Sequence, residues 1–312
     1  MNKLSIIVTI YKNENNIIPF YEDFNNNIAP YLDDYEIIMV NDDSPDNSWT
    51  IMKEIASKDK KVKIIKLFRN FGAVAASFTG LQNASGDCAK IKAAAIQEPA
   101  SLTIQMYEKW KHGAKSVIAV REARNDSNIS TFFSNLYYCL VRKMITKNMP
   151  KGGFDTYLVD RAIIDHLVLQ NDRNSPITLQ LLWMGCGNEI VYYERLKRKI
   201  GKSSWTFSKK FKLFMDSFVG FSYIPIRFMT IIGLLFSFVS VIYVLNMIVA
   251  SIQGKIDIRG YTTMVVIIAF SAGLIMFSLG ILGEYIWRTL DAARNRPISI
   301  IETRVNFEEE KE

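Results

Sequence analysis

Polar side chains follow two short apolar runs near the start of the chain. Thr9, Tyr11 and Glu14 lie at the end of the first run and just after it, and Asp42 opens the acidic cluster 42–46 after the second. Ligands of open α/β sheets bind at the carboxyl ends of the strands. A turn rich in Asp, Ser and Pro is, taken alone, more often a solvated turn or a helix cap. Two such loops at adjacent strand ends favour a ligand site.

A third candidate loop reads Arg69-Asn70-Phe71-Gly72. An arginine can bind a diphosphate through two parallel hydrogen bonds, and a glycine turn lets the backbone approach closely. An ordinary turn between a strand and a helix is the alternative interpretation.

Five basic residues crowd into positions 195–202. Attraction to anionic lipid headgroups would account for them. The sharper alternative is that Arg198 and Lys202 bind phosphate groups of the substrates.

The elements that must position these loops follow from short apolar runs rich in β-branched residues, separated by stretches of helical periodicity. This alternation predicts an α/β fold, a doubly wound and mostly parallel sheet that extends to about residue 205. The predicted strands are 6–10, 35–40, 62–67, 88–94 and 116–120, and the predicted helices are 16–32, 48–57, 101–112, 129–145 and 161–169.

Two later stretches, 228–252 and 262–283, contain no charged residue. Each is long enough to cross about 30 Å of hydrocarbon as a helix. Buried helices of a soluble core are the alternative. The short link between them predicts an antiparallel transmembrane hairpin.

Basic residues flank this hairpin on both sides. Lys212 and Arg227 precede it and Arg288 and Arg294 follow it, and such an excess of positive charge marks the cytosolic side. Both termini are therefore predicted to be cytosolic in a multi-pass protein of the inner or plasma membrane. The amphipathic segment 206–222 predicts an interfacial helix on the inner leaflet, and a helix packed on the soluble domain is the alternative.

Composition excludes several kinds of site. The three cysteines form no CxxC motif, and with only two histidines a divalent metal would have to be held by oxygens, which favours Mg²⁺ or Mn²⁺. The net charge of +7 is concentrated just before the apolar region, which indicates a membrane surface and no nucleic acid partner. The amino terminus lacks the apolar core of a signal peptide.

Taken together, these motifs resemble family 2 glycosyltransferases of the GT-A fold, in the branch that transfers a sugar to dolichyl or undecaprenyl phosphate. The resemblance is carried in order by SIIVTIYKNENNI, EIIMVNDDSPDNS, KLFRNFG, GLQNASGD, IQEP and GKSSWT, followed by the hairpin. It implies that Thr9, Tyr11 and Glu14 line the pocket for the base and ribose. It also implies that Asp42 lies near the uracil and that Arg69 and Asn70 lie near the nucleotide.

The family carries two metal-binding carboxylates where this chain has Ala93 and Ala95. Gln97 is retained, and Glu98 stands where the family usually has aspartate, as a further candidate ligand. Binding of Mg²⁺ or Mn²⁺, and with it catalysis, is therefore predicted to be weak. We interpret Ala95 as an engineered substitution and Ala93 as natural variation, and a naturally degenerate member is the alternative.

The same resemblance implies roles around the acceptor. Asp155 matches an aspartate assigned as a base, although a lipid phosphate is mostly ionised at neutral pH and need not be deprotonated. Asp155 would then position the acceptor, and its alternative role is to cap a helix beginning near Val159. Arg198, Lys202 and Ser203 are predicted to bind the lipid phosphate and the diphosphate.

The predicted reaction is inverting transfer of a sugar from a UDP-hexose, with glucose favoured, to undecaprenyl phosphate at the cytosolic face. A processive polysaccharide synthase is a rival interpretation. Such an enzyme would need more transmembrane helices and a Gln-x-x-Arg-Trp element, and we find neither in the sequence. A non-catalytic membrane scaffold remains the alternative, and assembly into a homo-oligomer stays open. The predicted divisions are a cytosolic nucleotide-sugar-binding domain (1–205), an interface helix region (206–227), the hairpin (228–288) and a cytosolic tail (289–312).

Overall fold

The computed structural model describes residues 2–122, 128–170, 172, 175–186, 188–196, 207–222, 224–253 and 260–307. It divides into two compact units. The first contains Met1–Phe214 together with Pro297–Glu312, and the second contains Met215–Arg296.

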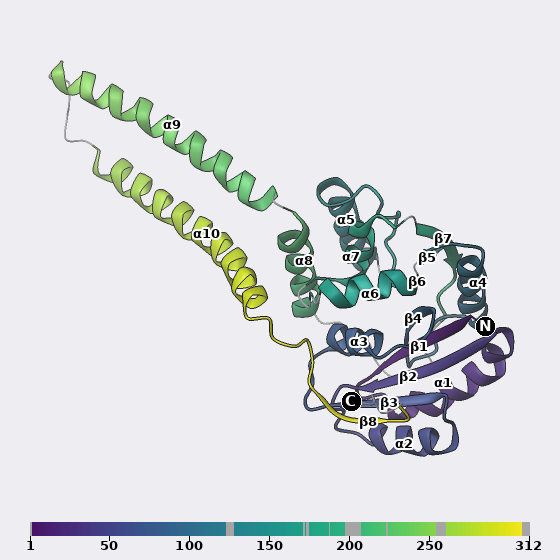
Figure 1. Cartoon of the computed structure of the whole chain (residues 1–312). Coiled ribbons are helices and arrows are strands. Elements are labelled where there is room, and N and C mark those ends of the chain that lie inside the picture. Colours follow the sequence, from purple (N-terminus) through teal and green to yellow (C-terminus); the bar gives the residue numbers. More distant parts are fainter. Residues whose placement is uncertain are drawn as a thin grey trace. The chain divides into compact units, whose positions relative to one another are not determined.

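Among the described residues of the first unit, eight strands form one sheet in the order β7-β5-β6-β4-β1-β2-β3-β8 (Figure 1). Pairs β1–β2, β1–β4, β2–β3 and β5–β7 are parallel, whereas β6 runs antiparallel to both neighbours and β8 is antiparallel to β3. The strands are β1 (Lys3–Ile10), β2 (Asp34–Asn41), β3 (Val62–Leu67), β4 (Cys88–Ala93), β5 (Ser116–Arg121), β6 (Thr156–Asp160), β7 (Asn188–Tyr193) and β8 (Ile301–Val305).

Helices cover both faces of this sheet, with α3 on one face and α1 and α2 on the other (Figure 1). Helix α1 buries Ile17, Phe20 and Phe24, a spacing that forms one apolar stripe. On the other face, a Cβ added to Gly80 of α3 would lie 2.2 Å from Ile7. The helices of this unit are α1 (Glu14–Asn27), the 3₁₀ helix Ala29–Tyr31, α2 (Ser48–Lys58), α3 (Ala73–Gln82), α4 (Ala100–Lys111), α5 (Asn128–Met144), α6 (Arg161–Gln170) and α7 (Ile177–Met184).

The strand register brings the ends of the central strands to one edge. Ile10 of β1 is opposite Asn41 of β2, and Thr9 is opposite Ala93 of β4. Because β6 runs the other way, its first residue, Thr156, lies at this same edge, opposite Ala119 of β5. The loops predicted to bind ligands therefore lie at one edge of the sheet. The predicted fold, a doubly wound and mostly parallel α/β sheet, is confirmed.

Three features differ from the sequence predictions. Strands β6 to β8 and helices α3 and α7 were not among the predicted elements. The idea that Asp155 caps a helix near Val159 is wrong, because Val159 lies within β6 and the next helix begins at Arg161. The predicted tail 289–312 contains β8, whose end is held by Asn306: its amide donates to the carbonyls of Ala56 (2.7 Å) and Val62 (2.8 Å).

The second unit is built from long apolar helices. Helix α8 (Phe207–Phe221) begins in the first unit and ends in the second, and is followed by α9 (Ile224–Ile252) and α10 (Tyr261–Ala293). Ile224–Tyr243 and Phe270–Ala293 are long and apolar enough to cross a membrane, and they are almost wholly exposed. Long apolar helices that stay unburied are expected for lipid-facing segments, not for a soluble core.

Polar contacts within this unit join α8 to the end of α10. The guanidinium of Arg288 lies 2.7 Å from Asp216 and 3.2 Å from Glu284. The Tyr285 hydroxyl donates to the carbonyl oxygen of Ser222 at 2.8 Å. These contacts hold the two helices together beside the apolar spans.

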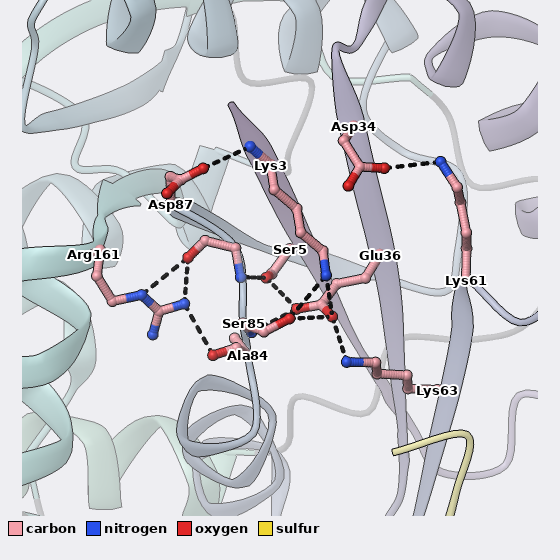
Figure 2. A network of polar contacts seen from close by, with 11 residues as sticks. Lys3, Ser5, Asp34, Glu36, Lys61, Lys63, Ala84, Ser85, Asp87 and Arg161 are labelled. Carbon is pink, nitrogen blue, oxygen red and sulfur yellow. Dashed lines mark hydrogen bonds and ion pairs between the residues drawn. The ribbon is translucent and has the colours of Figure 1, made fainter. Parts of the chain in front are cut away.

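A buried carboxylate stabilises the amino-terminal half of the sheet (Figure 2). Glu36 on β2 accepts hydrogen bonds from the Ser5 hydroxyl (2.6 Å) and from the Ser85 amide (2.6 Å) and hydroxyl (2.8 Å). It also pairs with Lys63 at 2.8 Å and Lys3 at 3.2 Å. Burial raises the pKa of Glu36, but the bonds from Lys63, Ser5 and Ser85 outweigh it and lower the pKa to about 2.

We predict that Glu36 makes the first unit sensitive to acid. Its pKa is lower in the folded state, so its contribution is complete above pH 4.5 and is lost as the pH falls toward 2, an effect of up to about 3 kcal/mol. Glu36→Gln should lower the thermal unfolding midpoint of the full chain in detergent at pH 7 and flatten its dependence on pH between 5 and 2. Glu302→Gln, which alters an exposed ion pair with Lys66, should change little. An unchanged pH dependence in Glu36→Gln would contradict this role.

Candidate functional site

The loops after β1 and β2 are bonded to each other. The Lys12 amide donates to the Ser44 hydroxyl at 2.7 Å, and that hydroxyl donates to Asp46 at 2.6 Å. The Asn47 amide donates to the carboxylate of Glu14 at 2.9 Å, and the Glu14 amide donates to Asp46 at 3.2 Å. The predicted site residue Glu14 therefore fixes two loops relative to each other.

Two non-glycine residues in these loops adopt left-handed backbone conformations. Lys12 has φ of 53° and Asp43 has φ of 50°. Such conformations are strained for residues with a Cβ, and strain of this kind concentrates at functional sites. Thr9, near the end of β1, is half-buried, and the ring of Tyr11, in the loop that follows, is exposed. The structure therefore brings Thr9, Tyr11 and Glu14 to the same edge.

Asp42 connects this pair of loops to a third. It is buried, and its carboxylate accepts hydrogen bonds from the amides of Phe71 (2.7 Å) and Gly72 (2.9 Å). Burial, the largest influence, raises the pKa of Asp42 against the opposing effect of these amides. Gly72 has φ of 93°, which only glycine adopts readily. Asp42 thus shapes the turn that carries Arg69 and Asn70, both exposed at its surface.

The loop after β4 contains the two alanines. Ala93 is exposed and Ala95 is half-buried, and neither side chain offers an oxygen. The side-chain oxygen of Gln97 accepts a hydrogen bond from Arg195 at 2.6 Å, and its backbone carbonyl accepts one from the Leu196 amide at 3.0 Å. The segment after β7 is therefore bonded to this loop.

Glu98 anchors the same loop to the interior. One carboxylate oxygen lies 2.8 Å from the ammonium of Lys90, which is fully buried, and the other accepts a hydrogen bond from Thr156 at 2.6 Å. Burial raises the pKa of Glu98, but Lys90, Lys92 and the Thr156 hydroxyl together outweigh it, so the pKa is lowered. Both oxygens are bound to the protein, so Glu98 supports the loop instead of presenting a free carboxylate.

These residues do not fit a Mg²⁺ or Mn²⁺ site. Such hard cations take oxygen ligands, usually including carboxylates. Ala93 and Ala95 supply none, and the oxygens of Gln97 and Glu98 have protein partners. Across the described part of the chain, no group of three or more His, Cys, Asp or Glu side chains could hold a metal.

Asp155 lies where β5, β6 and β7 meet. Its carboxylate pairs with the guanidinium of Arg121, the last residue of β5, and lies 3.4 Å from the hydroxyl of Tyr193, the last residue of β7. The side chain of Asp155 is half exposed, so it is held by a cation and still open to solvent. Just before it, a Cβ on Gly153 would overlap the ring of Tyr138 at 2.0 Å, which fixes the path of the chain.

Asp155 is close to the alanine loop because its neighbour Thr156 bonds Glu98. The sequence predictions missed the supporting residues Arg121 and Tyr193. For Arg121, the available signal was its position at the end of a predicted strand. The remaining predicted site residues, Arg198, Lys202 and Ser203, lie outside the described residues.

Comparisons with known proteins agree over nearly the whole chain. The model for glycosyl transferase family 2 matches residues 5–219, and the model for the GtrB C-terminal hairpin matches residues 224–288. The chain is 32% identical to an SfII prophage-derived bactoprenol glucosyl transferase of Shigella flexneri, covering 96% of this chain and 97% of that protein. It is 30% identical to the putative glycosyltransferase CsbB of Bacillus subtilis, covering 96% and 91%.

The chain is also similar to a solved structure, glucosyl-3-phosphoglycerate synthase from Mycobacterium tuberculosis in complex with Mn²⁺, UDP-glucose and phosphoglyceric acid. The TM-score is 0.44 and the identity 15%, over 64% of this chain and 73% of that one.

We predict that Asp42 holds the turn 69–72 in place. In Asp42→Asn the side chain has one oxygen, so it can accept only one of the two amide hydrogen bonds. Loss of a hydrogen bond to a charged group lowers stability by about 1.5–3 kcal/mol. Hydrogen exchange of the Phe71 and Gly72 amides in the full chain should therefore accelerate at least about tenfold, as measured by mass spectrometry of peptides that cover the turn. The control is Asp43→Asn, because asparagine tolerates the left-handed backbone there. Equal exchange in Asp42→Asn and the unaltered chain would rule out this role.

Proposed function

Because this chain belongs to glycosyl transferase family 2, we propose that it transfers a hexose from a nucleotide sugar to a polyprenyl phosphate at a membrane surface. The donor is a UDP-hexose, with glucose favoured, and the acceptor is undecaprenyl phosphate. One observation carries the proposal: a family 2 domain is followed by a matching GtrB C-terminal hairpin in a single chain. Two relatives that align with 96% of this chain are named bactoprenol glucosyl transferases.

The transfer is a single displacement with inversion. An oxygen of the lipid phosphate attacks the anomeric carbon, a new C–O bond forms, and the bond from that carbon to the diphosphate oxygen breaks as UDP leaves. The phosphate monoester is mostly dianionic at neutral pH, since its second pKa is about 6, so it attacks without a base. Asp155 is proposed to position the acceptor, and the Arg121 guanidinium beside it offsets repulsion between the two anions.

The nucleotide is proposed to bind across the bonded loops at the carboxyl edge. Thr9, Tyr11 and Glu14 are proposed to contact the base and ribose, with Asp42 beside them. Arg69 and Asn70 contact the nucleotide from the turn that Asp42 supports. Arg198, Lys202 and Ser203 are proposed for the lipid phosphate and diphosphate.

The hairpin is proposed to span the inner or plasma membrane with both of its ends on the cytosolic side. The chain leaves the first unit before α9 and returns to it after α10, where β8 pairs with β3. Two segments of one folded sheet must lie on the same side of a bilayer, which requires an even number of spans. The excess of basic residues at both ends of the hairpin supports the cytosolic assignment. An acceptor with a polyprenyl tail stays in the bilayer, so this anchor keeps the site near it.

Turnover by this chain is proposed to be weak, because the residues around Ala93 and Ala95 do not fit the metal site on which the family's chemistry depends. The same observation favours a second candidate function, a membrane scaffold or regulator that binds a nucleotide sugar without transferring it. Nucleotide binding is common to both candidates, so only turnover separates them.

We predict that Ala95→Asp raises transfer in the presence of Mg²⁺ or Mn²⁺ by about 10²-fold or more, because a metal-binding carboxylate would help to neutralise the departing diphosphate. The assay incubates the full chain in detergent with undecaprenyl phosphate, either metal and a panel of nucleotide sugars, and identifies the lipid product by mass spectrometry. Ala95→Asn introduces a side chain of the same size as aspartate but without its charge, so its transfer activity should stay at the level of the unaltered chain. A folded Ala95→Asp protein that binds UDP and forms no lipid-linked sugar would favour the scaffold instead.

A further inference from the structure

The turn after β3 carries an arginine that lies over a neighbouring aromatic ring. The guanidinium carbon of Arg69 is 4.2 Å from the centroid of the Phe71 ring. This distance is well within the range of about 6 Å over which a cation is attracted to the face of an aromatic ring. Arg69 is exposed and Phe71 is half-buried, so the ring forms a fixed surface that limits the positions of the guanidinium.

The residue that carries this ring is itself held from the interior. The Phe71 amide donates to the buried carboxylate of Asp42 at 2.7 Å, and the Gly72 amide donates to the same carboxylate at 2.9 Å. Burial, the largest influence, raises the pKa of Asp42, whereas the nearby charge of Arg69 lowers it. Asp42 therefore fixes the backbone at Phe71, and the Phe71 ring lies under the guanidinium.

The hydrogen-bonding groups of Arg69 are available to a ligand. Attraction to a ring requires no hydrogen-bond acceptor, and a guanidinium carries five N–H donors in one plane. Within the described part of the chain, the Arg69 donors make no hydrogen bond or ion pair. Two parallel donors of a guanidinium match two oxygens of a phosphate group. The turn thus presents a charged group that is held in place and has open donors.

We propose that Phe71 positions Arg69 to bind the diphosphate of the nucleotide, so that Phe71 raises nucleotide affinity without touching the ligand. The inference rests on the proposed function, because it requires a nucleotide site at the carboxyl edge. Within UDP, the diphosphate is anionic and the uracil and ribose are neutral. A guanidinium with open donors therefore recognises the diphosphate.

The test measures binding of UDP and of uridine to the full chain in detergent and Mn²⁺ by calorimetry. Phe71→Leu keeps an apolar side chain but removes the ring, so the Kd for UDP should rise about three- to tenfold. Phe71→Tyr keeps the ring and should bind UDP like the unaltered chain. Phe68→Leu removes an exposed ring from the same segment and should also leave the Kd unchanged.

A double-substitution cycle tests whether Phe71 acts through Arg69. Arg69→Ala should weaken UDP binding at least about tenfold, as expected for loss of a charge-assisted contact. Adding Phe71→Leu to Arg69→Ala should weaken it no further, because the group that the ring positions is already absent. Losses that simply add would show that Phe71 acts independently of Arg69 and would overturn the proposal.

Uridine binding and hydrogen exchange separate positioning from a general effect on the turn. In Phe71→Leu, uridine binding and exchange of the Gly72 amide should both match the unaltered chain. An equal loss for uridine and UDP, or faster exchange at Gly72, would show that the ring only supports the turn. Unchanged UDP binding in Phe71→Leu overturns the inference but leaves the proposed function standing, whereas failure of the unaltered chain to bind either ligand rejects both.

Discussion

The buried carboxylate of Glu98 is the contact on which the candidate site depends. It pairs with Lys90 of β4 and accepts a hydrogen bond from Thr156 of β6, so it joins the parallel strands to the antiparallel one. Gln97 precedes Glu98, and Asp155 precedes Thr156. The loop after β4 and the loop before β6 therefore both lie beside one ion pair. Removing one partner of a buried pair costs about 3–5 kcal/mol. The spacing between the two loops is therefore set by an interaction that the fold cannot readily lose.

Buried charged groups have different surroundings at the amino and carboxyl ends of the strands. At the amino end, Glu36 is surrounded by donors and cations that satisfy it fully. At the carboxyl end, the ammonium of Lys92 is buried without a hydrogen-bond partner among the described residues. Buried polar groups are normally paired because an unpaired one lowers stability. Departures from that rule concentrate where a protein binds or reacts, and this one lies one residue from Ala93.

The sequence predicts most of the parallel core because its strands are largely apolar runs, and β3 begins and ends at the predicted residues. Strand β8 is not predicted from the sequence, because three of its five residues are exposed and carry no apolar pattern. The position of Arg121 beside a predicted strand was a signal, but its contact with Asp155 could not be predicted, since Arg121 and Tyr193 are far apart in sequence and meet only through the pairing of β5 with β7. Asp42 and Glu98 could be selected as site residues, but their supporting roles depend on backbone amides and a buried lysine that only the folded chain brings together.

Strand β8 has a consequence for how the two units work together. It pairs with the outer edge of β3, and an uncovered edge strand is prone to pair with other chains. The strand that protects this edge comes after the apolar hairpin, so the sheet is complete only when the chain has passed through α9 and α10 and returned. Completion of the sheet and the proposed insertion of the hairpin into a membrane are thereby linked through chain connectivity. Under the proposed transfer to a lipid acceptor that stays in the bilayer, that link would favour a finished site only where the acceptor is present.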